Sequence, residues 1–315
     1  MTTVPLRDAA TVMLVRDAPG GGPAVGSDAD DHDAHDVSVL EVFMLRRNLQ
    51  SDFVGGAYVF PGGGVDDHDR HTDLGPVCEG RTDLDASAQL DLESGGLAFW
   101  VAAIRESFEE AGVLLAYGPD GTMMRLDDPV TAARFAEHRR AVDSGERRLV
   151  DICGDEQLRL AVGTMHYFAH WITPVGAPRR YDTRFFVGRA PELQVPLHDD
   201  REVIANLWIR PSDALARHRA GEFEMIFPTV RTLMAIERFH SADELLAAAA
   251  AVGDVPTILP RIVADEADEG GVRIVLPGDP GYDDLVSIEI PNGLPLTALA
   301  DSQRGGGPGA PTSSS

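Results

Sequence analysis

The chain has 315 residues, of which 43% are apolar and 25% charged, and its formal net charge is −24 at pH 7. This length suffices for one large domain or two modest ones, and the composition is ordinary for a soluble globular protein. The acidic balance argues against binding to nucleic acid or to anionic membranes, because the field of the protein repels phosphate groups. A small phosphate-bearing substrate stays compatible with it if a cation shares the site.

All 27 basic residues are arginines, so the sequence offers no lysine for covalent catalysis. Cys78 and Cys153 are not at metal-ligand spacing, and so small a cysteine count favours a reducing, intracellular setting. Residues 9–15 are too short for a signal-peptide core, and residues 245–252 are too short to span a bilayer. We therefore predict a cytoplasmic protein with no membrane or nucleic-acid partner. Its oligomeric state stays open, a homodimer included.

In chain order, the first elements are strands. Residues 10–16 and 37–46 are β-rich runs separated by a Gly- and Asp-rich loop, and residues 57–60 form a short third strand. Residues 66–96 carry nine acids against two arginines and show little periodicity. We predict a long, partly disordered surface loop there.

The rest of the chain mixes helices and strands without strict alternation. Helices are expected at 97–115, 129–142, 156–161, 211–219, 228–239 and 241–251, the last with Ser241 as its cap and Glu244 in the capping-box position. Strands are expected at 167–174, 181–188 and 205–209, followed by a hairpin at 257–263 and 272–276. This order predicts the α/β class, with a mixed sheet flanked by helices.

Three glutamates share one face of the helix predicted at 97–115. At roughly 100° per residue, Glu106, Glu109 and Glu110 fall within an arc of about 100°, opposite an apolar stripe. Their mutual repulsion amounts to about a few tenths of a kcal/mol per pair, and Arg105 relieves part of it through its i,i+4 relation to Glu109. A hard divalent cation relieves it fully, because Mg²⁺ takes carboxylate oxygens as ligands. The alternative is a solvated acidic helix face.

A run of glycines, Gly62 to Gly64, closes a strand upstream of this helix. Glycine lets the backbone approach a phosphate closely, so Gly62 and Gly63 are candidates for substrate binding. Taken alone, such a run is more often only a turn.

These two segments together resemble the Nudix hydrolase signature. Its second half, R-E-U-x-E-E-x-G-U with U aliphatic or similar, matches residues 105–113, and residues 60–63, Phe-Pro-Gly-Gly, resemble its opening. The signature has a glutamate eight residues before the arginine, where this chain has Leu97, and the glycines stand further upstream than usual.

An insertion between the two halves is typical of one subfamily. The wider sequence resembles the motif-19 branch of nucleoside-diphosphate-linked-moiety hydrolases over most of residues 10–285. The resemblance implies a Nudix α/β/α sandwich at 8–240 with the acidic insertion at 66–96. A C-terminal extension at 241–300 and a disordered tail at 301–315 would follow.

The resemblance also implies a function. It implies Mg²⁺- or Mn²⁺-dependent hydrolysis of a diphosphate bond in a nucleotide-linked small molecule. Members of this branch cleave CoA and acyl-CoA to 3′,5′-ADP and phosphopantetheine derivatives. An ADP-ribose or nucleotide-sugar diphosphatase is the alternative enzyme. The alternative outside catalysis is a nucleotide sensor with a Nudix fold, which Leu97 in place of the glutamate favours.

The resemblance assigns the catalytic and metal-binding positions. Glu106, Glu109 and Glu110 are the expected metal ligands, and Arg105 is expected to brace them. Glu202, shortly before Trp208, resembles a further acidic position that acts as ligand or base in several members. The sequence does not decide whether Glu202 or one of the helix glutamates activates the water.

Arginines near residue 180 are candidates for clamping substrate phosphates. Guanidinium groups match phosphate oxygens, which favours Arg179, Arg180 and Arg184. In an alternating strand Arg180 and Arg184 share one face with Asp182, which could simply pair with them.

Overall fold

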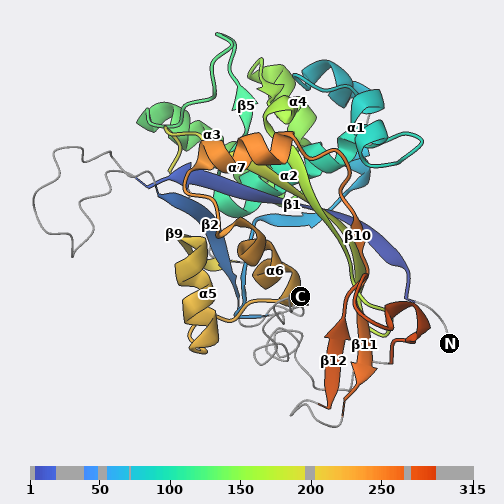
Figure 1. The fold of residues 1–315 in the computed structure, drawn as a ribbon. Coiled ribbons are helices and arrows are strands. Elements are labelled where there is room, and N and C mark those ends of the chain that lie inside the picture. The colour runs from blue at the N-terminus through green and yellow to red at the C-terminus, as the bar shows by residue number, and fades with distance from the viewer. Residues whose placement is uncertain are drawn as a thin grey trace, which may run out of the picture.

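The structure is a computed structural model that describes residues 4–18, 39–48, 55–70, 72–195, 203–265 and 271–288. A twisted sheet lies between helices that cover both of its faces, as the predicted α/β/α sandwich requires (Figure 1). The predicted tail at 301–315 lies outside the described residues. Within those residues, none of the helices is both long and apolar enough to cross a membrane.

Eight strands form the main sheet. They are β1 (Leu6–Asp17), β2 (Leu40–Arg47), β3 (Tyr58–Val59), β4 (Gly62–Gly64), β7 (His166–Ile172), β8 (Arg180–Arg189), β9 (Val203–Ile209) and β10 (Thr257–Ile258). The order is β10-β7-β8-β1-β2-β3, with β4 against β1 and β9 against β2. β1 runs parallel to β8 and β10 parallel to β7, whereas the other pairs are antiparallel.

β1 and β2 diverge along their shared edge. β2 pairs with β1 only at residues 15–17, whereas residues 9–11 of β1 pair with β4. β8 pairs with residues 6–15 along the other edge of β1, and β4 fills the gap that the departing β2 leaves. All three residues of β4 are glycines, so this part of the sheet carries no side chains.

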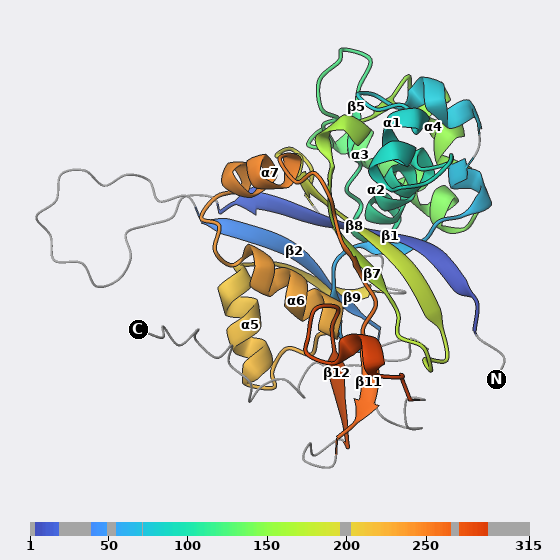
Figure 2. The same ribbon diagram turned by 45° about the vertical axis from the view of Figure 1, so that its right-hand side comes forward.

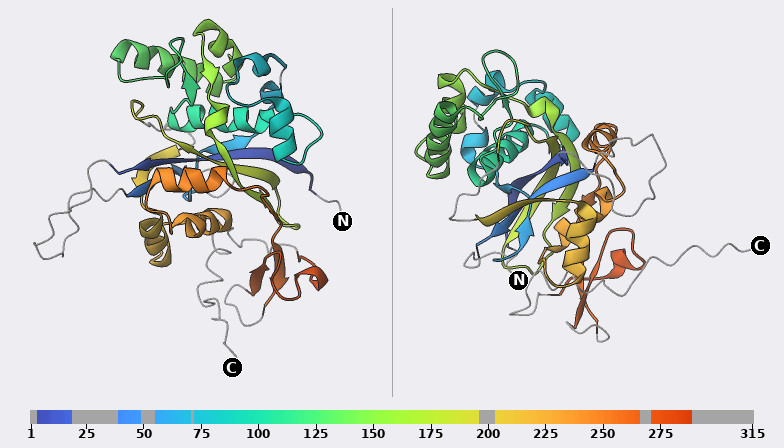
Figure 3. Two further views of the ribbon diagram at one scale, coloured as in Figure 1. Left: turned by 45° about the horizontal axis from the view of Figure 1, so that its top comes forward. Right: turned by 90° about the vertical axis from the view of Figure 1, so that its left-hand side faces the viewer.

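Four helices cover one face of the sheet: α1 (Asp83–Gln89), α2 (Leu97–Ala111), α3 (Pro129–Asp143) and α4 (Leu149–Asp155). Three more cover the other face: α5 (Pro211–Arg219), α6 (Phe227–Ile236) and α7 (Ala242–Ala250). Figure 3 shows the two groups on opposite sides of the strands. Short elements join the first group: the 3₁₀ turns at Asp67–Arg70, Thr72–Val77 and Val162–Thr164, and the pair β5 (Ala116–Tyr117) and β6 (Arg159–Leu160).

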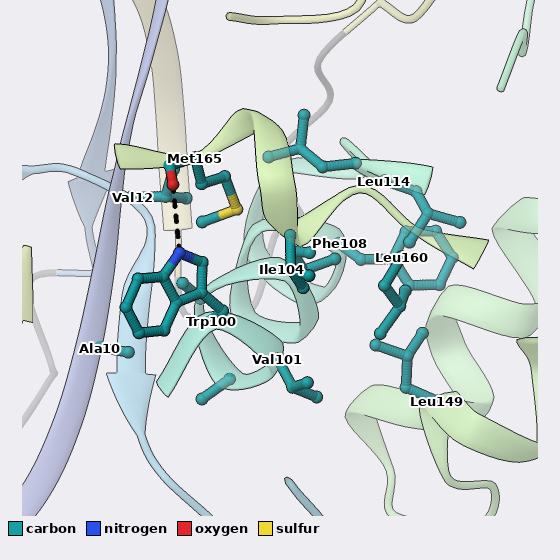
Figure 4. Packing of buried hydrophobic residues seen from close by; sticks show 14 of the residues in the cluster. Ala10, Val12, Trp100, Val101, Ile104, Phe108, Leu114, Leu149, Leu160 and Met165 are labelled. Atoms are coloured by element: carbon teal, nitrogen blue, oxygen red, sulfur yellow. Dashed lines mark hydrogen bonds between the residues drawn. The ribbon is translucent and has the colours of Figure 1, made fainter. Parts of the chain in front are cut away.

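Alternation along the strands divides the core into two layers. In β1, Ala10, Val12 and Leu14 pack toward α2, whereas Met13 and Val15 pack toward α5, α6 and α7. Figure 4 shows the α2 layer, where the fully buried Trp100 donates from Nε1 to the carbonyl of Met165 at 3.1 Å. The indole therefore buries its apolar surface without leaving its donor unpaired.

The C-terminal segment adds a hairpin beside β7. β11 (Arg261–Ala264) and β12 (Val272–Val275) are antiparallel and lie beyond the end of β10, followed by a 3₁₀ turn at Tyr282–Asp284 (Figure 2). Ile262 and Ile274 face each other in its register and join the same apolar layer as Trp171. The hairpin predicted from the sequence is confirmed at 261–264 and 272–275.

The acidic insertion at 66–96 is not the irregular loop that its composition suggested. Its acids are used as helix caps, which a charge count does not reveal. Thr82 and Asp85 form a capping box at the start of α1. Asp83 accepts the backbone N–H of Leu97 at 3.0 Å and that of Gly95 at 2.9 Å. The insertion thereby caps the helix that carries the glutamates.

Two further predictions of secondary structure were wrong. Residues 156–161 are not helical: α4 ends at Asp155, and Gln157 adopts a left-handed φ of 54° that stops helix propagation before β6. Residues 257–263 are not one strand. Pro260 has no N–H for a ladder, so Thr257–Ile258 joins the main sheet while the hairpin begins at Arg261.

Candidate active site

The glutamates of α2 lie against the glycine strand β4. A Cβ atom on Gly63 would overlap with the carboxylate of Glu106. The backbone N–H of Gly62 donates to Oε2 of Glu110 at 2.9 Å, and Glu110 is buried. Because β4 has no side chains, carboxylates from a helix on one face of the sheet reach the gap between β1 and β2. The structure thus brings the predicted residues Gly62, Gly63, Glu106 and Glu110 together.

Arg105 holds two carboxylates of α2, those of Glu106 and Glu109, in place. Its Nη1 donates to Glu106 Oε1 and to Glu109 Oε2, each at 2.9 Å. Its Nη2 donates to the carbonyl of Gly64 at 2.7 Å. Only 7% of Arg105 is exposed, so the guanidinium is close to fully engaged in a water-poor setting. One cation therefore fixes two glutamates of α2 relative to β4.

Asp69 is a partner of Arg105 that the sequence did not point to. Its carboxylate accepts from Nε at 3.0 Å and from Nη2 at 3.0 Å, and Asp69 is 3% exposed. It lies in the insertion, which composition had suggested to be loop. The signal in the sequence that could have pointed to Asp69 is the pair Asp66 and Asp67 just after the glycines, which shows that acidic residues cluster near β4. Asp69 Oδ2 also accepts the N–H of Asp66 at 2.9 Å.

Burial shifts the protonation of the glutamates. Loss of hydration raises the pKa of Glu106 to about 7 and that of Glu109 to about 8, although Arg105 opposes both shifts. Nearby carboxylates add to the rise: Asp69 and Asp66 for Glu106, and Glu106 for Glu109. The site holds more negative charge than Arg105 compensates. A further cation would relieve it.

The carboxylates of this site are the type of ligand that a hard divalent cation binds. Glu106, Glu109 and Glu110 all line one cavity, and carboxylate oxygens are the ligands that Mg²⁺ and Mn²⁺ take. Within the described residues no three acidic, His or Cys side chains already converge on one point. Glu106 and Glu109 turn to Arg105 and Glu110 turns to Gly62, so ligation would require these side chains to rotate toward the cavity.

A cavity of about 520 Å³ extends from the glutamates across the sheet. Its floor follows the strand register, in which Gly64, Ala9, Thr183 and Trp171 form one row over β4, β1, β8 and β7. Three strand spacings of about 4.8 Å place Trp171 about 14 Å from Gly64. The start of α6, including Phe227, and the hairpin segment complete the lining.

The two ends of this cavity differ in chemistry. The end at β4 carries the glutamates, Arg105 and Asp66. At the far end Trp171 packs edge-on against Phe227, with ring centroids 5.9 Å apart. Most of the other residues that line this end are apolar, namely Ile172, Pro174, Phe185, Ile226, Pro228, Pro260 and Ile274, and Thr173, Arg179, Tyr181 and Thr229 add polar groups. A molecule with a charged end and an apolar end matches this arrangement.

The structure does not bring Arg180 and Arg184 to the glutamates. Arg180 donates from Nε to the carbonyl of Thr173 at 3.1 Å. Arg184 pairs with Asp182 at 2.8 Å, and its guanidinium lies 4.4 Å from the ring centroid of Phe99 in α2. The three residues share one face of β8, as alternation predicted, but it is the face toward α2.

Other arginines do line the cavity. Arg179 lies at the start of β8, and Arg47 ends β2. Glu202, the further acidic residue predicted from the sequence, lies outside the described residues. Val203, which follows it, pairs with Arg47 in the sheet.

Comparison with known proteins identifies the family of this chain. Residues 81–236 match the family described as NUDT19 Nudix domain. The acyl-coenzyme A diphosphatase NUDT19 of Gallus gallus is 30% identical over 277 residues, which cover 76% of this chain and 70% of that protein. The chain belongs to the NUDT19 branch of the Nudix family. The Homo sapiens protein of the same name is 29% identical, over 77% of this chain and 72% of its own length.

A solved structure supports the Nudix fold. A NUDIX hydrolase from Alicyclobacillus acidocaldarius superposes with a TM-score of 0.59 at 26% identity, over 80% of this chain and 99% of that one. The chain is thus a Nudix hydrolase, and Nudix hydrolases generally use divalent metal ions. Residue 97, where the Nudix signature has a glutamate, is a buried leucine here. In this Nudix hydrolase Arg105 instead receives an acid from the insertion, Asp69.

We expect Asp69→Asn to lower both stability and turnover. The substitution leaves the buried guanidinium of Arg105 without the carboxylate that accepts from its Nε and Nη2, and breaking such a pair costs about 3–5 kcal/mol in the extreme case of complete removal. kcat should fall by a larger factor than KM rises, because Arg105 positions Glu106 and Glu109, the expected metal ligands. Denaturant unfolding and steady-state kinetics measure the two effects. Asp67→Asn, on an exposed neighbour, is the control, and equal behaviour of the two variants would contradict the assignment.

Proposed function

We propose that this Nudix hydrolase cleaves the diphosphate bond of CoA or acyl-CoA, giving 3′,5′-ADP and phosphopantetheine or its acyl derivative. The two-ended cavity carries this proposal. A diphosphate suits the end with the glutamates, and a pantetheine arm with an acyl group suits the apolar end at Trp171. The names of the Gallus gallus and Homo sapiens relatives support the same substrate class. ADP-ribose would place a polar ribose against the apolar end, which disfavours that alternative.

We assign the metal to Glu106, Glu109 and Glu110, with Mg²⁺ or Mn²⁺ as the ion. When bound, such an ion neutralises charge on the diphosphate oxygens and acidifies water near phosphorus. Arg105 anchors Glu106 and Glu109 beside β4, from where their side chains would rotate toward the cavity to bind the ion. The bare backbone of Gly62 to Gly64 lets the diphosphate approach closely. Arg47, which ends β2 and lines the cavity, is our candidate for contacting phosphate oxygens in place of Arg180 and Arg184.

Two residues are candidates for the general base. Glu106 is one, because it lines the cavity beside Gly63, and it would serve as base if Glu109 and Glu110 hold the ion. Glu202 directly precedes the strand residue paired with Arg47, which lines the cavity. Either carboxylate would take a proton from the water that attacks one phosphorus atom. The bond from that phosphorus to the bridging oxygen breaks, and the oxygen leaves with the other phosphate.

The setting of the enzyme follows from its composition. Cys78 and Cys153 are both free thiols, which suits the reducing cytoplasm that we propose as its location. The net charge of −24 favours a small nucleotide-linked substrate over nucleic acid as partner. A monomer and a homodimer are both compatible with the site, because every residue assigned to it comes from one chain.

Glu109→Gln and Glu110→Gln should each lower kcat by at least about 100-fold while the fold survives. Each change removes a charged ligand yet keeps the shape of the side chain, so the loss falls on transition-state charge stabilisation. Kinetics at saturating Mg²⁺ or Mn²⁺ measure it, and circular dichroism checks the fold. Glu137→Gln, on the exposed side of α3, is the matched control. Near-normal turnover of either ligand variant would refute the assignment.

Metal affinity should rise with pH between about 6 and 8.5. The pKa values of Glu106 and Glu109 are raised to about 7 and about 8, so ligation must displace protons at lower pH. The same shifts affect the stability of the metal-free fold. The folded state holds protons on these glutamates more tightly than the unfolded state, where the pKa is 4.5, so the free energy of unfolding falls as pH rises from 4.5 through 7 to 8. Binding of a cation would restore it. Mn²⁺ titration calorimetry in two buffers with different ionisation enthalpies counts the released protons. An affinity independent of pH would be inconsistent with this picture.

The substrate is tested by direct competition among candidates. CoA or a short acyl-CoA should give a higher kcat/KM than ADP-ribose, NADH or a nucleotide sugar, with Mg²⁺ and with Mn²⁺. Mass spectrometry should show 3′,5′-ADP and the matching phosphopantetheine. A tenfold preference for ADP-ribose would establish the alternative enzyme. Nucleotide binding without any turnover would establish the sensor instead.

A further inference from the structure

The C-terminal hairpin closes the apolar end of the substrate cavity. Ile274 of β12 lines it, as does Pro260 directly before β11. Ile274 is 4% exposed and belongs to the apolar layer that contains Trp171 and Phe227. The hairpin lies beyond residues 81–236, the part of the chain that matches the Nudix family description. A segment outside the matched region thus supplies one wall of the site.

The distance along the cavity fits the length of the pantetheine arm. The row of strand residues from Gly64 to Trp171 spans about 14 Å, three strand spacings. The arm joins phosphorus to sulfur through about thirteen bonds. At about 1.2 Å a bond, as in an extended peptide, it reaches about 16 Å. With its diphosphate at β4, a CoA thioester would place its sulfur beside Trp171 and its acyl group under the hairpin.

The lining of this end suits a hydrocarbon. Trp171, Phe227, Pro260 and Ile274 all line the cavity with apolar surface, and the rings of Trp171 and Phe227 pack edge-on. Burying an acyl chain against them removes apolar surface from water on both sides, which favours binding in proportion to chain length.

We propose that the hairpin β11–β12 is the determinant of acyl-group preference, and that Ile274 contacts the acyl chain next to the thioester. This inference rests on the proposed function and assigns part of its substrate to a particular wall. It implies that the preference for chain length lies in the C-terminal extension and not in the signature helix α2.

The register of the hairpin provides a matched control. Ile262 on β11 is the direct partner of Ile274 on β12, and both are buried in the same apolar layer. Ile274 lines the cavity, whereas Ile262 is not among its lining residues. Truncating either side chain removes the same atoms from the same layer, so a difference between the two variants reports contact with the substrate.

The experiment compares Ile274→Ala with Ile262→Ala. For both variants and the wild type, kcat/KM is measured for CoA and for acyl-CoAs of increasing chain length, at saturating Mg²⁺. In Ile274→Ala the ratio of kcat/KM for medium-chain acyl-CoA to that for CoA should fall at least tenfold, because the lost methyl groups contact only the acylated substrate. In Ile262→Ala the ratio should stay within about threefold of wild type, whatever the loss of stability.

The outcomes separate this inference from the proposed function. If the wild type cleaves no CoA compound, the proposed function fails. If it cleaves them and both variants keep the wild-type ratio, or shift it equally, the inference about Ile274 is wrong. If Ile274→Ala does not fold, Ile274→Val replaces it, with an expected fall of about threefold in the same ratio, and an unchanged ratio would overturn the inference.

Discussion

The buried guanidinium of Arg105 is the interaction on which the site depends. It joins the segment that contains Gly64 and Asp69 to the helix α2, some forty residues later, through the Gly64 carbonyl, Asp69, Glu106 and Glu109. A buried charge with this many partners is costly to disturb, because each lost contact leaves an ion unpaired in a medium of low polarity. The same cation that fixes the fold locally therefore fixes the carboxylates that the chemistry needs.

The glycine strand β4 explains how a helix on one face serves a cavity on the other. The cavity floor consists of residues such as Thr11 and Phe185, which point away from α2 and toward α6. Side chains of α2 would ordinarily be screened from that face by the sheet. Where β2 departs from β1, three residues without side chains fill the gap, and the carboxylates reach the cavity along them. The glycines thus contribute to the site because they leave space for the α2 carboxylates, besides any backbone contact with phosphate.

Local patterns predicted the catalytic helix, and tertiary contacts decided what the sequence left open. Helical periodicity and a nearly contiguous motif suffice to group Glu106, Glu109 and Glu110, which line one cavity in the structure, and their role as metal ligands stays a prediction. Asp69 was missed because its partner is 36 positions away along the chain. Alternation correctly placed Arg180 and Arg184 on one face of β8, but a period of two does not say which face meets the substrate. Composition made the insertion look like a loop, since acids that cap helices and acids in solvent count alike.

The excess of acid in this protein is compatible with an anionic substrate because charge is distributed unevenly. At the reacting end of the cavity the acids are buried around Arg105, and their raised pKa values mean that they attract positive charge before anything else. A divalent cation bound there would offset most of the local negative charge, while the rest of the surface stays acidic and repels long polyanions such as nucleic acid. A compact diphosphate can enter the end of the cavity where the cation would bind. A long polyanion would also have to lie against the acidic surface around the cavity, which repels it. The same charge distribution thus admits one class of phosphate compound and disfavours the other.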